Sequence, residues 1–303
     1  MDYIAAGNVM SDIIEREDGS RSAMHLGGPA FFALAGIRLW TDSVKLCSGV
    51  GADFEEIYGP WMRANRVPAD AVSVRADHTT LHVLRYLENG KYAHESIYGA
   101  QNLGYLKTRP EDLEAALDHT KGVYMAQNTD RVYWAKLARL KERHGFKFML
   151  ELEHNNGWED VREICKLADY FSCNLNEASA LLGIPREREE EIIAQLLRLP
   201  VEQIFFRVGA RGSYALYGNT ATFVPAVDIG RPVDPTGCGN CSTGSAMYAY
   251  TEGFDPIMTA VMANIAAAYN VLQYGPYPHF TEQTRREAVA LAEKLRADYP
   301  PLL

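Results

Sequence analysis

Short apolar runs alternate with helical patterns along most of the chain, and this alternation restricts the possible folds more than any other feature. The expected strands are residues 2–6, 44–47, 122–126, 146–152, 170–174 and 203–208. The expected helices are residues 30–39, 54–65, 132–144, 161–168, 176–182, 189–197, 241–251 and 257–272. Strands separated by helices indicate a parallel sheet, because parallel neighbours need a crossover connection. The sequence therefore predicts an α/β fold with helices on both faces of a mostly parallel sheet.

Two segments interrupt this alternation with the pattern of β-hairpins. Residues 79–97 are rich in β-branched and aromatic side chains around Asn89-Gly90, and residues 13–24 surround Asp18-Gly19. Asn-Gly and Asp-Gly favour tight hairpin turns because both residues tolerate positive φ. We expect the hairpins, at approximately 13–26 and 76–99, to form a small β lid inserted into a single domain of residues 1–303. Decoration of a sheet edge is the alternative.

Composition excludes several classes of function. Lys and Arg number 30 against 39 Asp and Glu, which gives a net charge of −9. Nucleic-acid binding and a polybasic membrane patch both need clustered cations, so we expect neither nucleic acid nor membrane as a partner. No signal peptide or membrane-length apolar run is visible, and five scattered cysteines do not form a disulfide framework. These features predict a cytoplasmic protein, and the acidic balance leaves an anionic small-molecule substrate open.

The most informative segment is 233–244, where a proline and two glycines precede an expected helix. Glycines let backbone N–H groups converge where a Cβ would clash, and a helix N-terminus adds the positive end of the helix dipole. Gly237, Cys238, Gly239 and Asn240 therefore predict an anion hole for a phosphate or a developing negative charge. A tight connection without a ligand is the alternative.

Two further turns have a similar character. Asn174 and Glu177 open an expected helix directly after a strand, and their polar groups suit a hydrated Mg²⁺ ion. The same spacing is also typical of a helix cap. Gly209 and Gly212 follow the strand that contains Arg207, at a second place where backbone can approach a nucleotide.

Taken together, these motifs resemble the ribokinase (PfkB) family of sugar and nucleoside kinases almost from end to end. The matching segments are Gly27-Gly28, Gly49-Val50-Gly51-Ala52-Asp53-Phe54, Asn174 with Glu177, Gly209 with Gly212, Asp234 to Asn240, and Met262 to Ala267 with Gly275 after it. Asp234 to Asn240 is similar to the family's C-terminal motif Asp-Thr-x-Gly-Ala-Gly-Asp. The order and spacing of the segments carry the resemblance.

The resemblance implies a ribokinase-like doubly wound sheet with a small β lid, and ATP-dependent phosphorylation of a hydroxyl on a sugar, polyol or nucleoside. ATP and Mg²⁺ are the implied cofactors, and a monovalent cation is a further expectation. A homodimer through the lid is compatible with the tyrosines Tyr86, Tyr92 and Tyr98. The implied nucleotide-side residues are Asn174, Glu177, Arg207, Gly209, Gly212, Asp234, Thr236 and Asn264, with Glu177 also at the metal.

The resemblance also implies a substrate side, which comprises Asp12, Gly27, Gly28, Phe32 and Arg85. Asp12 corresponds to the family's substrate-binding Asp near the first strand, and a role in capping a turn is the alternative. Arg85, in the expected lid, is as readily explained as a solvated arginine on a strand.

One position departs from the family pattern in a way that affects the chemistry. The last residue of the C-terminal motif is an Asp that acts as general base in the family, and here it is Asn240. A carboxylate accepts a proton from a hydroxyl, whereas a carboxamide does not at neutral pH. Three interpretations stay open: a kinase with an altered base, a weak kinase, and a protein that keeps the fold for binding a nucleotide or metabolite.

Other departures lie close to the same motifs. Pro29, Phe31 and Phe32 follow the paired glycines in place of smaller or polar residues, which predicts a more apolar pocket. Arg207 stands where the family often has Thr, and Glu151 and Glu153 stand where it often has Asp.

Cys238 and Cys241 also form a Cys-x-x-Cys motif. At a helix N-terminus this spacing can lower a thiol pKa and allow redox chemistry, or it can provide half of a zinc site. No second cysteine or histidine pair follows at ligand spacing, and the nearby histidines are scattered over the hairpins. We therefore favour small residues that pack a tight turn.

Overall fold

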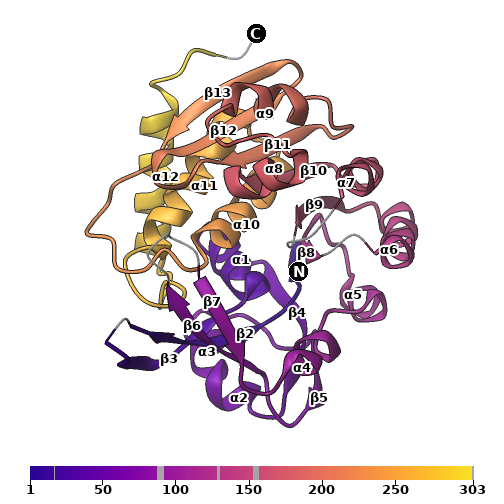
Figure 1. Cartoon of the computed structure of the whole chain (residues 1–303), viewed down its shortest axis with the longest axis vertical. Helices are drawn as coiled ribbons and strands as arrows, with labels where there is room; N and C mark the ends of the chain where they lie inside the picture. Colours follow the sequence, from indigo (N-terminus) through magenta and orange to yellow (C-terminus); the bar gives the residue numbers. More distant parts are fainter. Residues whose placement is uncertain (17, 87–91, 128–129, 153–156, 302–303) are drawn as a thin grey trace.

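A computed structural model describes residues 1–303 except 17, 87–91, 128–129, 153–156 and 302–303. In it, the strands expected from the alternating pattern form one large sheet. Its strand order is β13-β12-β11-β10-β9-β8-β1-β4-β5 (Figure 1). The strands are β1 (Tyr3–Ala6), β4 (Val44–Gly51), β5 (Val72–Ala76), β8 (Gly122–Gln127), β9 (Lys147–Leu152), β10 (Tyr170–Asn174), β11 (Gln203–Arg207), β12 (Gly212–Tyr217) and β13 (Thr220–Pro225). Pairing is parallel from β11 to β5, and the β12–β13 hairpin adds antiparallel strands at one edge.

Each face of this sheet has its own hydrophobic core. On β1, Tyr3 and Ala5 join one core, and Ile4 and Ala6 join the other. This alternation follows from the two-residue period of a strand, and burial on both sides explains why the strands are continuous apolar runs in the sequence. The structure confirms the expected α/β sheet with helices on both faces.

The helices divide between the two cores. The first core packs against α1 (Pro29–Arg38), α2 (Phe54–Ile57), α3 (Gly59–Ala64), α10 (Cys238–Thr251), α11 (Pro256–Asn270) and α12 (Glu282–Arg296). The second packs against α5 (Pro110–Ala116), α6 (Arg131–His144), α7 (Trp158–Cys165), α8 (Leu175–Leu182) and α9 (Glu189–Leu196). Two short elements, α4 (Ala100–Tyr105) and the 3₁₀ turn η1 (Gly209–Arg211), complete the described helices.

Both predicted hairpins are present, and together they form a second sheet that we call the small sheet. It comprises β2 (Met10–Glu15), β3 (Arg21–Gly27), β6 (Thr80–Tyr86) and β7 (Tyr92–Ser96), in the order β3-β2-β6-β7. Each hairpin is antiparallel, and a parallel pairing of β2 with β6 joins them. In Figure 1 the small sheet lies outside the helix layers of the large sheet. The Asn89-Gly90 turn itself lies outside the described residues.

Some elements differ from the sequence-based expectation. The helix expected over 54–65 divides into α2 and α3 beside Pro60, which lacks an N–H and disfavours helical backbone at the residue before it. The sequence analysis did not predict β5, α12 or the β12–β13 hairpin. Among the described residues, no helix has the length and apolar character needed to span a membrane.

Candidate active site

Several predicted nucleotide-side residues come together at the carboxyl ends of neighbouring parallel strands. Glu151 lies near the end of β9, and Asn174 and Arg207 end β10 and β11, where the register places these two side by side. The helix α10 packs across β8, β9, β10 and β11 and begins at this edge. In open α/β sheets, the carboxyl edge is where ligands bind, because the loops and helix N-termini face it.

The turn that leads into α10 has the geometry expected of an anion hole. Gly237 adopts a left-handed conformation with φ 75°, which glycine reaches without strain. The backbone N–H groups of Gly239 and Asn240 have no hydrogen-bond partner among the described residues. Two donors at the start of a 14-residue helix are therefore available to an anion.

Neighbouring side chains hold this turn in place. The Asn270 amide of α11 donates to the Thr236 carbonyl oxygen at 2.9 Å. The Asp234 carboxylate accepts from the Thr236 N–H at 3.1 Å and from its hydroxyl at 2.7 Å. These contacts fix the donors before any ligand arrives, which is the arrangement that makes electrostatic stabilisation effective.

Phe32 packs against the same turn from α1. Its ring lies so close to Gly237 that a Cβ at that position would clash with the ring atoms. Only 2% of Phe32 is exposed. The ring therefore supports the turn from the core side in this conformation, and the predicted contact of Phe32 with substrate stays a prediction.

A buried carboxylate lies directly beneath Asn240. Glu151 is 3% exposed, and its Oε2 accepts from Asn240 Nδ2 at 3.0 Å and from the Tyr124 hydroxyl at 2.6 Å. Its Oε1 accepts from the Thr243 hydroxyl at 3.1 Å. Burial and the Glu151 charge hold the pKa of Tyr124 well above its usual value, so the phenol stays protonated and donates.

Arg207 brings a positive charge to the same point. Its Nη2 lies 2.6 Å from Glu151 Oε1 and 3.5 Å from Glu177 Oε2. Burial lowers the pKa of Arg207, but the two carboxylates outweigh burial and raise it overall. Its Nη1 lies against Gly239, where a Cβ would clash with it. One guanidinium nitrogen is therefore placed beside the free N–H groups of α10.

Asn174 and Glu177 form a reciprocal helix cap. The Glu177 N–H donates to Asn174 Oδ1 at 2.9 Å, and the Asn174 N–H and Nδ2 donate to the Glu177 carboxylate at 2.8 and 2.6 Å. The capping interpretation of this motif is therefore confirmed. Because the Glu177 oxygens also face Arg207, this conformation suits a water-mediated contact with a hydrated Mg²⁺ better than direct coordination.

Asp12 represents the substrate side. It lies on β2 and is 6% exposed, and Gly27 leaves the space for its carboxylate, since a Cβ there would clash with Oδ2. Burial, together with the nearby Asp234 charge, raises the pKa of Asp12 to about 7. A buried carboxyl that titrates near neutral pH suits binding of a hydroxyl group.

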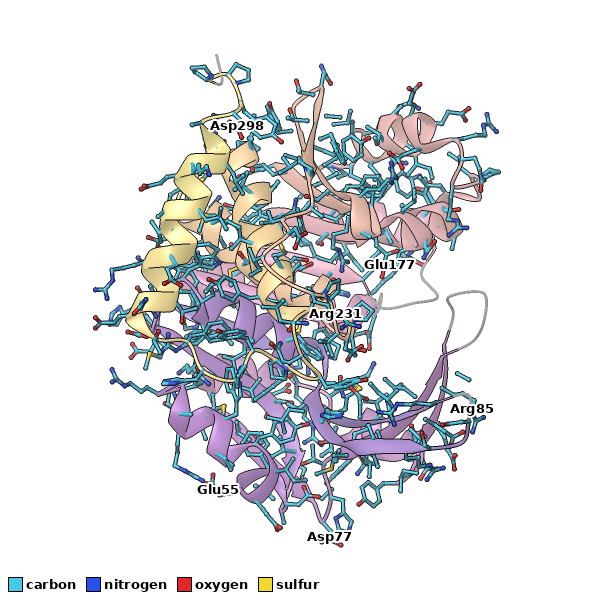
Figure 2. All side chains as sticks on the ribbon, turned by 90° about the vertical axis from the view of Figure 1, so that its left-hand side faces the viewer. Glu55, Asp77, Arg85, Glu177, Arg231 and Asp298 are labelled. Carbon is cyan, nitrogen blue, oxygen red and sulfur yellow. The ribbon has the colours of Figure 1, made fainter. Side chains whose placement is uncertain are left out.

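Two more predicted site residues have protein partners in this structure, and their predicted ligand contacts stay predictions. Arg85 is exposed on the small sheet and pairs with Glu15, and Figure 2 shows it well separated from Glu177. The Asn264 amide donates to the Val224 and Pro225 carbonyl oxygens, both at 3.0 Å, and its Oδ1 accepts from Ser213. Asn264 therefore joins α11 to the β12–β13 hairpin with all its polar atoms.

The predicted glycines shape the chain around the site. Gly28 precedes α1 with φ 96°, and Gly209 and Gly212 form the turn after β11 with φ 66° and 127°. A Cβ at Gly212 would clash with the Val224 carbonyl oxygen. Their predicted contacts with nucleotide or substrate stay predictions.

The Cys-x-x-Cys motif packs inward. The Cys238 and Cys241 thiols point to the Ala267 and Ala266 carbonyl oxygens of α11, at 3.6 and 3.5 Å. Burial raises the pKa of Cys238 to about 11 and holds that of Cys241 well above its usual value. These thiols are the opposite of reactive low-pKa cysteines. The described residues also contain no cluster of side chains suited to a metal ion.

Sequence reasoning missed Tyr124, Thr243 and Asn270, and it noted Glu151 only as a replacement for Asp. Tyr124, Glu151 and Asn270 are polar residues in largely apolar segments, whereas Thr243 lies among other small and polar residues. A polar side chain on a buried strand or helix needs a partner, and this was the available signal.

Comparison with known proteins establishes the family. Residues 3–283 match the family model described as "pfkB family carbohydrate kinase". The chain belongs to the PfkB family of carbohydrate kinases. It is 22% identical over 316 residues to an uncharacterized protein of Schizosaccharomyces pombe, covering 92% of this chain and 86% of that protein.

Solved PfkB-like structures agree on the fold. A nucleoside kinase from Burkholderia thailandensis in complex with inosine has a TM-score of 0.76 at 19% identity and covers 99% of both chains. Ribokinase from Giardia lamblia has a TM-score of 0.75 at 18% identity and covers 95% of this chain and 98% of the other. The expected ribokinase-like fold, with its second small sheet, is thereby confirmed.

Proposed function

We propose that this PfkB protein is a slow ATP-dependent kinase that phosphorylates a hydroxyl group of a sugar, polyol or nucleoside. The observation that carries the proposal is the convergence of two free backbone N–H groups, of Gly239 and Asn240, with Nη1 of Arg207. Phosphoryl transfer depends mainly on positioning and on stabilising negative charge, and this arrangement offers both. In a protein of net charge −9, such a local set of hydrogen-bond donors is needed to hold a nucleotide.

The surrounding residues fit the expected cofactors. Bound ATP with Mg²⁺ would supply the phosphoryl group. Gly239, Asn240 and Arg207 would bind and orient its phosphate oxygens, and Glu177 would face the hydrated Mg²⁺. Asp12 would accept a hydrogen bond from a substrate hydroxyl.

Asn240 is the reason to expect a low rate. Its Nδ2 donates to Glu151, so its Oδ1 can accept a hydrogen bond from a hydroxyl but cannot remove the proton. Loss of a general base typically costs about 10²- to 10⁴-fold in rate. Positioning by the remaining site would leave measurable turnover.

The test combines calorimetric titration of ATP and Mg²⁺ with an assay of ADP formation over a panel of sugars, polyols and nucleosides. We expect nucleotide binding together with slow, acceptor-dependent ADP formation. Arg207→Met should weaken nucleotide binding at least tenfold in protein that remains folded. Arg211→Met is the matched control, because Arg211 lies nearby in sequence but pairs with Glu189. Absence of nucleotide binding in the wild type would refute the proposal.

A second function has one specific observation in its favour. The hydrogen bond from Asn240 to Glu151 fixes the carboxamide in a role without proton transfer, which suits a protein that binds a nucleotide or metabolite without turnover. Nucleotide binding with no ADP formation above the acceptor-free background for any compound would support this second function.

A further inference from the structure

We propose that Glu151 and Asn240 function as a pair. Glu151 carries the buried negative charge of the pocket and orients the Asn240 carboxamide. An Asp at position 240 is therefore compatible with a stable, active site only if Glu151 is neutralised. This proposal deepens the proposed function and rests on it for its effect on turnover. Glu151 is a positioning residue in this scheme, because it acts on the acceptor through Asn240.

The first step concerns the direction of the Asn240 amide. An ionised carboxylate only accepts hydrogen bonds, so Asn240 must direct its NH₂ group at Glu151, at 3.0 Å. The Tyr124 hydroxyl donates its proton to Glu151 at 2.6 Å, so its oxygen can only accept from Asn240 Nδ2, at 3.3 Å. Both contacts therefore leave the Asn240 oxygen directed away from them. Glu151 decides which end of the carboxamide meets a ligand.

The second step concerns an Asp at the same position. It would bring one of its oxygens to about the place of Nδ2, roughly 3 Å from Oε2 of the buried Glu151, and two carboxylates at that separation cannot both ionise. One of them would take up a proton. If the new Asp were protonated, it could not act as a base, and if Glu151 were protonated, its pair with Arg207 would weaken.

The third step concerns the charge balance of the pocket. Arg207 contacts two carboxylates, those of Glu151 and Glu177, so the three side chains together carry one negative charge. If an Asp at position 240 ionised while Glu151 stayed ionised, this charge would double directly beside the free N–H groups of α10. Asn240 keeps the site able to accept an anion.

The test compares wild type, Asn240→Asp, Glu151→Gln and the double variant that contains both changes. The double variant conserves the charge of the pocket, because it exchanges the carboxylate and the carboxamide between the two positions. We expect each single change to lower the melting temperature at pH 7.5 and the double variant to recover most of the loss. We also expect turnover at least tenfold above wild type in the double variant and no gain in Asn240→Asp alone.

The control combines Asn240→Asp with Asp169→Asn. Asp169 is another buried carboxylate, paired with Lys141 at 2.8 Å and Lys147 at 3.3 Å just before β10, at its opposite end. It shares no contact with Asn240, so its effect on stability should add to that of Asn240→Asp without recovery.

Two results would overturn the proposal: a double variant no more stable than Asn240→Asp, or a gain in turnover from Asn240→Asp alone. Failure of the proposed function looks different. In that case the melting temperatures would still show recovery in the double variant, but none of the four proteins would form ADP with any acceptor.

Discussion

The Arg207 guanidinium packs directly against Gly239 at the start of α10, and its Nη1 lies where a Cβ at residue 239 would be. The contact joins the end of β11 to a helix that begins about thirty residues later in the sequence. The far end of a flexible side chain can move aside more easily than backbone. A side chain at position 239 should therefore displace the guanidinium and leave the fold intact.

Gly239→Ala should accordingly weaken nucleotide binding while it leaves the free energy of unfolding nearly unchanged. Alanine favours a helix over glycine by about 1 kcal/mol, which offsets part of the local disturbance, so the free energy of unfolding should change by less than about 1 kcal/mol. Nucleotide affinity, measured by calorimetry, should fall at least tenfold. Gly104→Ala is the control, since Gly104 lies in α4 with open space around its Cβ position. Equal affinities for Gly239→Ala and wild type would contradict the proposed phosphate site.

The raised pKa of Asp12 should make the free energy of unfolding depend on pH. Its pKa is raised from 3.8 to about 7 in the folded protein, so between these values the folded state binds more protons than the unfolded state. Stability therefore falls as pH rises from about 4 to 7. At about 1.4 kcal/mol per pKa unit, Asp12→Asn should gain roughly 2–3 kcal/mol on wild type between pH 5 and pH 8.

Urea unfolding at the two pH values measures this difference. Asp77→Asn serves as the control, because Asp77 is exposed and should leave the pH profile of wild type unchanged. Parallel profiles for Asp12→Asn and wild type would show that Asp12 is not held in the raised-pKa state.

Asn264 should stabilise the fold even when no nucleotide is bound. Asn264→Ala removes the amide that bonds two carbonyl oxygens of β13, and it leaves Ser213 without its acceptor. Unpaired buried polar groups cost about 1–3 kcal/mol each, so we expect destabilisation of about 2–4 kcal/mol in thermal or chemical unfolding. Asn176→Ala, at an exposed site on α8, should cost less than about 0.5 kcal/mol. An Asn264→Ala protein with normal stability but weakened nucleotide binding would favour the sequence-based assignment of this residue to the cofactor.

Cys238 should react slowly with alkylating reagents. Burial raises its pKa to about 11, so the reactive thiolate is scarce at pH 8. Iodoacetamide labelling followed by mass spectrometry should show modification of Cys238 far slower in the native protein than in protein unfolded by urea. Rapid native labelling, or a Cys238–Cys241 disulfide formed under mild oxidation, would revive the redox interpretation.

The sequence predicted the strands best where both faces of a strand are buried. Strands such as Tyr3–Ala6 are buried on both faces and therefore appear as uninterrupted apolar runs. The edge hairpin β12–β13 mixes apolar, polar and small residues without strict alternation or a long apolar run, so it carries no comparable signal. The single helix expected over 54–65 is two helices, α2 and α3, and Pro60 lies near the start of the second.

The sequence predicted the turn and the start of α10, and it left out the side chains that contact them. The glycines and Asn240 lie in one segment with a recognisable spacing, so their position at the start of α10 followed from local sequence. Tyr124 and Glu151 reach Asn240 from other strands, and such contacts depend on how β8 and β9 pack beneath α10. Nothing local indicated that Arg85 would pair with Glu15, 70 residues away.

The strand order also has a consequence for how the protein matures. The strand nearest the N-terminus, β1, pairs with both β4 and β8, whereas α10 covers β8 to β11 and comes from the last quarter of the chain. Asp12 and Asn240 therefore belong to segments that lie 228 residues apart in the sequence. Contacts this distant in sequence slow folding, so the nascent chain must wait for α10 before it can capture a ligand.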